Sequence, residues 1–227
     1  GYTFIDCYTT IRNLVQSLGC RIFQAGGKWW IVSINQFATE NVAYSEYDYT
    51  ETWAAMEEVY NKGLAKSIGL SNFNKHQIER VLEVAKITPA VLQVESHPYL
   101  NQKKLIEFCK SKGIAVTAYT PLGAPGSDYL QSSEKKIVVL DDPVLKDIGK
   151  KYKKSPAQVC IRYQIERGVI VIPKTVHKER LLENLKVFDF SLSQADVAAI
   201  EKLNSNVRFV TFDEVLSHRF YPFADDD

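Results

Sequence analysis

Polar and charged side chains interrupt or follow the apolar, strand-like runs of this 227-residue chain. The amide of Gln93 lies inside the apolar run 90–94, and a buried amide needs hydrogen-bond partners, so we expect it to belong to a site. Lys174 and Arg180 follow the apolar run 169–173. A planar guanidinium with a nearby ammonium suits a dianion such as a phosphate. The alternative for these two cations is a solvated surface position, the commoner fate of such residues.

A second set of polar residues follows other strand-like runs: Ser71, Asn72, Tyr119, Thr120 and Thr175. Each lies at or just after the carboxyl end of its run, and in parallel barrels this is the face where sites are built. Hydroxyl and amide groups there can hydrogen-bond a ligand, and a phenol ring can stack on one. The alternative for Tyr119 is a half-buried packing role.

The elements that must position these residues alternate between strand-like and helical patterns. Six apolar runs are typical of strands: residues 2–6, 29–34, 66–70, 90–94, 114–119 and 169–173. Helical patterns between them have start signals at Thr50, Asn74, Asp142, Ser155 and Ser193. This alternation predicts an α/β fold with a parallel sheet covered by helices. Periodicity leaves open whether the sheet is a closed barrel or doubly wound, but the absence of a G-x-G-x-x-G motif counts against a Rossmann domain.

Composition narrows the class of partner. A net charge of +1 gives no electrostatic case for nucleic acid. No run approaches the roughly 20 apolar residues of a membrane span, and no signal-peptide pattern opens the chain. The four cysteines have no C-x-x-C spacing, which favours a reduced, cytoplasmic setting and no metal site. Because the only methionine is Met56, we expect the chain to begin inside a longer product or to be processed.

Five ordered motifs carry a specific resemblance. They are GLSNF at 69–73, QVESHPY at 93–99, AYTPLG at 118–123, IPKT at 172–175 with RLLEN at 180–184, and YPF at 221–223. Together they resemble the aldo-keto reductase family, and the match runs from Thr52 to Phe223. For His97, inside the second motif, we expect a structural role that satisfies backbone groups.

The resemblance implies a (β/α)8 TIM barrel of the aldo-keto reductase type, here with about six of its eight strands. It implies a single domain over 1–227, in which 52–227 is the cofactor-binding part and 1–51 is divergent. The implied activity is NADP(H)-dependent reduction of small aldehydes or ketones to alcohols by a monomer. Substrate choice in the family depends on the C-terminal segment, here 208–212, whose aromatic residues favour an apolar pocket.

The resemblance also implies a set of NADP(H)-binding residues: Ser71, Asn72, Gln93, Tyr119, Thr120, Leu122, Lys174, Thr175, Arg180, Glu183 and Asn184. Ser71, Asn72 and Gln93 would hydrogen-bond the nicotinamide carboxamide. Tyr119 would stack on the nicotinamide ring. The loop 122–128 would fold over the pyrophosphate. Lys174, Thr175 and Arg180 would hold the 2′-phosphate. Glu183 and Asn184 would contact the adenine.

The N-terminal part departs from the family, whose chemistry uses Asp, Tyr, Lys and His. Asp6 matches the aspartate. With Asp6 and Asn13 as anchors, the tyrosine position falls on Ile11, and Tyr8 could serve only if the loop is re-registered. The lysine position falls on Ile34, and no strand carrying the histidine is found. A fragment, a misread first 50 residues and a genuine non-catalytic relative all fit this pattern.

Two classes of function therefore stay open. One is a carbonyl reductase, which we expect to have little or no activity if this chain is complete. The other is a catalytically inactive NADP-binding protein or a crystallin-like structural protein. An open-sheet α/β protein outside the family is disfavoured by the order of the five motifs.

Overall fold

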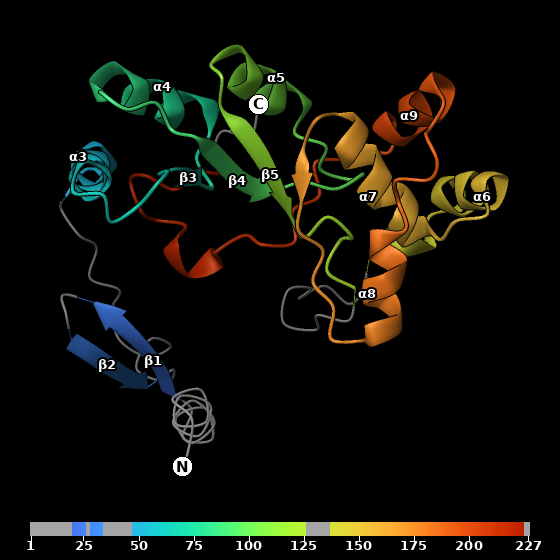
Figure 1. Cartoon of the computed structure of the whole chain (residues 1–227), viewed down its shortest axis with the longest axis horizontal. Helices are drawn as coiled ribbons and strands as arrows, with labels where there is room; N and C mark the ends of the chain where they lie inside the picture. Colours follow the sequence, from blue (N-terminus) through green and yellow to red (C-terminus); the bar gives the residue numbers. More distant parts are fainter. Residues whose placement is uncertain (1–19, 26–27, 34–46, 126–136, 225–227) are drawn as a thin grey trace. The chain divides into compact units, whose positions relative to one another are not determined.

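The computed structural model describes residues 20–25, 28–33, 47–125 and 137–224. It contains two compact units, Gly1–Glu46 and Tyr47–Asp227 (Figure 1). The predicted strand 2–6 and the candidate catalytic residues Asp6 and Tyr8 lie outside the described residues.

The first unit contains a β-hairpin. Strand β1 (Cys20–Ala25) pairs antiparallel with β2 (Lys28–Ser33), in a register that joins Cys20 to Ser33. The strand predicted over 29–34 is confirmed as β2, but its expected place beside parallel strands is wrong. A connection of two residues can join only antiparallel neighbours, because a parallel pair needs a long crossover. Strand β1 was not predicted from the sequence.

The second unit is built on a four-stranded parallel sheet in the order β3-β4-β5-β6. Its strands are β3 (Leu70–Ser71), β4 (Val91–Glu95), β5 (Ala115–Tyr119) and β6 (Ile170–Val171). Each follows a helix, as parallel pairing requires. The strands predicted over 90–94, 114–119 and 169–173 are thus confirmed in one parallel sheet, whereas the run predicted over 66–70 meets β3 only at Leu70. This sheet is open, with β3 and β6 at its edges in the described part of the chain.

Helices connect and flank these strands. They are α3 (Tyr49–Asn61), α4 (Lys75–Val84), α5 (Lys103–Ser111), α6 (Pro143–Tyr152), α7 (Pro156–Glu166), α8 (Lys178–Leu185) and α9 (Gln194–Glu201), with short 3₁₀ turns η1 (Val139–Asp141) and η2 (Asp213–Val215). The predicted N-caps Asn74, Asp142, Ser155 and Ser193 are confirmed, each with its side chain accepting from a first-turn N–H. The predicted cap at Thr50 is wrong, because Asp48 caps α3.

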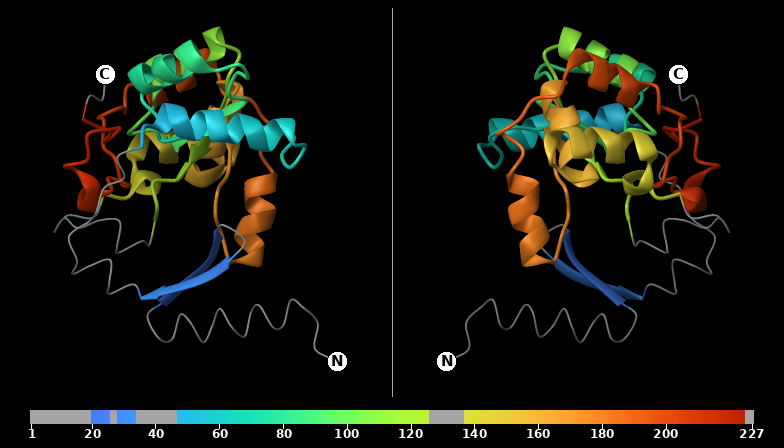
Figure 2. Two further views of the ribbon diagram at one scale, coloured as in Figure 1. Left: turned by 90° about the vertical axis from the view of Figure 1, so that its left-hand side faces the viewer. Right: turned by 90° about the vertical axis from the view of Figure 1, so that its right-hand side faces the viewer.

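Two hydrophobic clusters form the interior. One joins β3, β4 and β5 to α3, α4 and α5, with Leu92 and Ile78 fully buried. The other joins α6, α7 and α9 with Phe209 from the segment after α9. Figures 1 and 2 show α8 and η2 on opposite sides of this unit. Among the described residues, no helix is long and apolar enough to cross a membrane.

Candidate functional site

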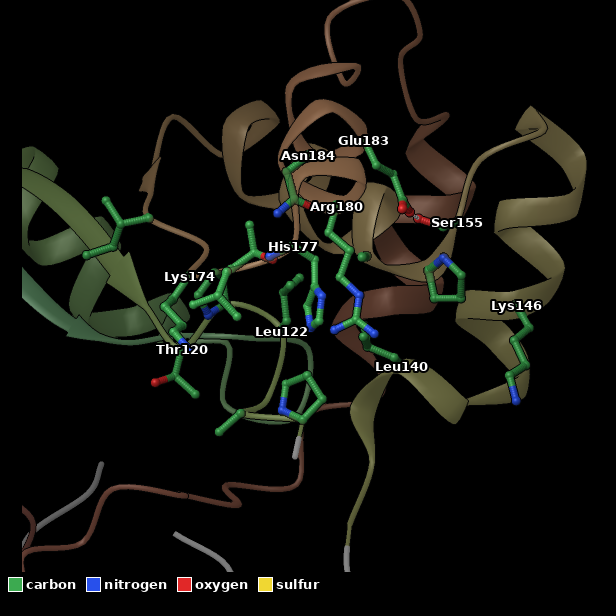
Figure 3. Close-up of a pocket in the computed structure, with 18 residues that line it drawn as sticks. Thr120, Leu122, Leu140, Lys146, Ser155, Lys174, His177, Arg180, Glu183 and Asn184 are labelled. Carbon is green, nitrogen blue, oxygen red and sulfur yellow. Dashed lines mark hydrogen bonds between the residues drawn. The ribbon is translucent and has the colours of Figure 1, made fainter. Parts of the chain in front are cut away.

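A cavity of about 1030 Å³ opens where β5 and β6 end and α8 begins. Seven predicted cofactor residues line it: Thr120, Leu122, Lys174, Thr175, Arg180, Glu183 and Asn184. All of these except Thr175 are labelled in Figure 3. The lining also includes Ser155, Ile172 and His177. Residues from two of the five sequence motifs therefore meet in one cavity, at strand ends where a site was expected from the sequence.

The positive side of this cavity comes from the chain between β6 and the first turn of α8. Figure 3 shows Arg180 and His177 extending into the middle of the cavity, with Lys174 beside Thr120 at one side. Lys174 and Arg180 are exposed, and no ion pair occupies either of them in the described part of the chain. The N-cap residue His177 makes no side-chain hydrogen bond to the first turn of α8. The positive end of the helix dipole thus adds to the two cations and favours an anion here.

Helix α7 fixes the other side of the cavity. Ser155, its N-cap, donates its hydroxyl to the carboxylate of Glu183. The side-chain amide of Gln158 donates to the backbone carbonyl of Glu183 (3.0 Å) and to that of Lys186 (2.9 Å). The last turn of α8 is therefore tied to the first turn of α7. Glu183 and Asn184, both partly buried, are held at the cavity wall.

The remaining predicted cofactor residues form a second group at the ends of β3, β4 and β5. The Tyr119 hydroxyl donates to Oδ1 of Asn72 (2.9 Å), and the Asn72 N–H donates to the carbonyl of Gln93 (2.9 Å). Ser71 pairs with Gln93 in the strand register. Burial, followed by the nearby Glu95 carboxylate, raises the pKa of Tyr119, so this phenol stays neutral. A neutral, fixed ring of this kind can serve as a stacking surface.

The cavity residues and the second group are joined by the peptide bond between Tyr119 and Thr120. Tyr119 belongs to the second group, and the next residue, Thr120, lines the cavity. Thr120 has a left-handed backbone (φ 50°), which turns the chain at the end of β5 into the cavity wall. Within the described residues, no cluster of three or more His, Cys, Asp or Glu side chains could hold a metal ion.

One polar pair at the end of β4 was not identified from the sequence. Glu95 and His97 are fully buried, and Nε2 of His97 lies 3.0 Å from Oε1 of Glu95. The expectation that the His97 side chain satisfies backbone groups is wrong, because its partner is this carboxylate. Its Nδ1 is a buried atom that has no hydrogen-bond partner among the described residues. The available signal was a glutamate directly after a buried apolar run, because a buried carboxylate must be paired.

Comparison with known proteins agrees with this architecture. A profile described as "Aldo/keto reductase family" matches residues 29–205. The chain is 51% identical over 167 residues to aldo-keto reductase family 1 member A1 of Gallus gallus, covering 74% of this chain and 50% of that protein. It is 46% identical over 186 residues to prostaglandin F synthase 1 of Bos taurus, covering 81% and 57%. It is 44% identical, with the same coverage, to prostaglandin-E(2) 9-reductase of Oryctolagus cuniculus.

The chain spans about half the length of these relatives, between 50% and 57%. The match covers all four strands of the parallel sheet and the whole cavity lining. The fold class expected from the sequence, an α/β protein of the (β/α)8 type, agrees with the family, although the described sheet has four strands and does not close. The chain belongs to the aldo/keto reductase family.

Proposed function

We propose that this protein binds NADP(H) in the cavity at the ends of β5 and β6. The observation that carries the proposal is the joint presence of Lys174, Arg180 and the start of α8 on one wall. This donor set fits a phosphate monoester, because a guanidinium and an ammonium complement a dianion and the helix start adds aligned N–H groups. Glu183 and Asn184, on the side of the cavity that α7 fixes, offer an acceptor and an amide to a purine.

The second group suits the nicotinamide end of the same cofactor. In the proposed complex, Asn72 and Gln93 hydrogen-bond the carboxamide, with Ser71 beside them, and the neutral ring of Tyr119 stacks on the nicotinamide. Bound NADPH would supply a hydride to a carbonyl carbon. The residues of this chain would hold the ring in one orientation, which accounts for a large part of catalysis by proximity.

The reaction class we propose is reduction of small aldehydes or ketones, with weak activity in this chain. The reduced carbonyl oxygen needs a proton from a positioned side chain, which contributes roughly 10²–10⁴-fold. The sequence places Ile11 and Ile34 where a tyrosine and a lysine would be expected, and Asp6 alone matches. The same observation favours a second candidate function, a catalytically inactive NADP-binding relative.

Cofactor binding is tested by titrating the purified protein with NADPH and with NADH and following tryptophan fluorescence. We expect NADPH to bind more tightly, because NADH lacks the 2′-phosphate. Arg180→Ala should weaken NADPH binding about ten-fold and leave NADH binding unchanged, the usual size of a lost hydrogen bond to a charged group. Lys178→Ala is the matched control, since it removes a positive charge from α8 outside the cavity lining. Equal affinities for NADPH and NADH would overturn the proposal.

Turnover is tested separately with NADPH and a generic aldehyde such as nitrobenzaldehyde. Activity that disappears in Tyr8→Phe would identify Tyr8 as the proton donor and support the reductase. Tight NADPH binding with no turnover would support the inactive relative.

A further inference from the structure

The Glu95 carboxylate holds a segment that is distant in sequence. Its Oε1 accepts from the backbone N–H of Phe209 (2.8 Å), and its Oε2 accepts from the backbone N–H of Val210 (3.0 Å). His97 contacts Oε1 as well (3.0 Å). Phe209 and Val210 lie after α9, more than 100 positions along the chain from Glu95. One buried charge at the end of β4 thus fixes two consecutive N–H groups that belong to no helix or strand.

The held segment packs against the wall of the cofactor cavity. Phe209 is buried; its ring centroid lies 5.0 Å from that of His97. A Cβ built on Gly123 would lie 2.2 Å from Cγ2 of Val139 and 3.3 Å from Cε2 of Phe209, so both side chains pack close to this loop. Gly123 has φ +73°, which favours glycine, and its neighbours Leu122 and Ala124 line the cavity. The loop 120–125 therefore packs against Val139 and against the Phe209 ring that Glu95 positions.

Further hydrogen bonds anchor this segment on either side of Phe209 and Val210. Upstream, the N–H groups of Ser205 and Val207 both donate to the carbonyl of Tyr99 (3.1 Å each). Downstream, the Tyr221 hydroxyl donates to the carbonyl of Thr211 (2.6 Å). The Glu95 contacts join these two anchors, and they are charge-assisted bonds in a buried place, about twice as strong as neutral ones.

We propose that Glu95 is a positioning residue that latches the C-terminal segment, residues 205–212, onto the cofactor loop and thereby sets the affinity for NADP(H). This inference rests on the proposed cofactor function. Without these Glu95 contacts, Phe209 leaves its place beside Gly123, and the loop 120–125 keeps Val139 but loses the part of its support that comes from Phe209. Glu95 does not line the cavity, but it is the register partner of Tyr119, so Phe209→Leu is the variant that isolates the path through Phe209.

The test compares Glu95→Gln with a matched control, Glu57→Gln. Glu57 is also a buried carboxylate that holds two consecutive backbone N–H groups, those of Lys86 (2.7 Å) and Ile87 (2.8 Å), together with Nε1 of Trp53 (3.1 Å). It ties α3 to the end of α4, away from the cavity lining. Both variants place an amide where a carboxylate accepts N–H bonds, so both should lower the free energy of unfolding. Only Glu95→Gln changes the contacts that hold the segment 205–212.

Two readouts separate a latch from a general loss of stability. In hydrogen exchange of the complete chain, Glu95→Gln should raise the exchange rate of peptides covering 205–212 about ten-fold, while Glu57→Gln leaves it unchanged. In NADPH titrations below the unfolding temperature of either variant, Glu95→Gln should weaken binding about ten-fold and Glu57→Gln less than about two-fold. Glu95→Asp, which keeps the charge, should recover part of both effects.

The outcomes distinguish the latch from the cofactor proposal. Unchanged exchange over 205–212 in Glu95→Gln overturns the latch. Faster exchange with unchanged NADPH affinity overturns the coupling to the cofactor. If the unsubstituted protein binds no NADPH, the cofactor proposal fails, and with it the coupling, while the exchange data still decide the latch. Should Glu95→Gln not fold, Phe209→Leu keeps both backbone contacts but shortens the side chain against Gly123, and unaltered NADPH affinity in that variant overturns the coupling.

Discussion

At the scale of single residues, the site depends on backbone conformations that most residues avoid. Asn72 (φ 58°) follows β3 and Thr120 (φ 50°) follows β5, and both are left-handed. This conformation costs a residue with a Cβ roughly 1–2 kcal/mol, although asparagine tolerates it better than most. Such strain concentrates at functional sites, where surrounding contacts over-determine it. Here the Tyr119 hydroxyl and the Gln93 carbonyl hold Asn72 in place.

Two substitutions of Asn72 separate its backbone role from its amide. Asn72→Gly and Asn72→Ala both remove the amide that Tyr119 contacts, but only glycine adopts a positive φ without cost. We expect Asn72→Ala to be less stable than Asn72→Gly by about 1 kcal/mol in urea unfolding. Both should weaken NADPH binding equally if the amide contacts the cofactor. Equal stabilities of the two variants would mean that the left-handed turn is not maintained in solution.

Seven of the residues that line the cavity could be named from the sequence, because each of their motifs places polar groups at or just after the end of an apolar run. Where a run ends is a local property, and the parallel sheet then brings all such ends to one edge. The Glu95 contacts could not be predicted in the same way. Their partners are the backbone N–H groups of Phe209 and Val210. Because every residue except proline has a backbone N–H, the residue types in the sequence do not indicate which of these groups the carboxylate binds.

At the scale of elements, helix starts were more predictable than strand partners. Asn74, Asp142, Ser155 and Ser193 each combine a capping side chain with a following proline or a reciprocal third residue. The start of α3 was misplaced by two residues because the local sequence offers several caps, and Asp48 prevails through a long-range contact. Its Oδ2 lies 2.8 Å from Nη2 of Arg80 on α4. The β1–β2 pairing was missed because an apolar run does not specify its neighbour.

The Asp48 contacts make part of the stability depend on pH. A hydrogen bond from the Thr50 backbone and one from Arg80 lower the pKa of Asp48 from 3.8 to about 2. Because the folded-state pKa is depressed, the stabilisation is fully present above about pH 4 and is lost as the pH falls towards 2. Asp48→Asn retains an N-cap oxygen but loses the charge that pairs with Arg80.

We therefore expect Asp48→Asn to be less stable than the unsubstituted protein at pH 6, and the difference to shrink as the pH is lowered to about 2.5. Urea unfolding of both proteins across this range measures the difference in free energy of unfolding directly. The contributions of the other carboxylates are common to both proteins and cancel in this difference. A difference that stays constant with pH would show that the Arg80 pairing adds nothing beyond the cap.

At the scale of the whole molecule, the described sheet and α8 leave apolar surface uncovered. Strand β6 is an edge strand, and Ile170 is exposed on it. Helix α8 has no buried residue in the described structure, and its apolar side chains and their neighbours are exposed: Val176, Leu181, Leu182, Leu185 and Phe188. Open edges and contiguous apolar patches are the usual sites of association between chains. This surface, rather than any weakness of the two hydrophobic clusters, is where we expect the protein to self-associate.

Leu185→Glu tests this expectation against Val84→Glu. Leu185 is 61% exposed within the α8 patch, and Val84 is 54% exposed at the end of α4, so the two substitutions remove apolar surface of similar exposure at different places. Leu185→Glu should reduce light scattering and binding of a hydrophobic dye, while Val84→Glu changes neither. Both should leave the free energy of unfolding within about 0.5 kcal/mol, as surface substitutions usually do. A loss of more than about 2 kcal/mol in Leu185→Glu alone would mean that Leu185 is covered in solution, since charge is costly only where water is excluded.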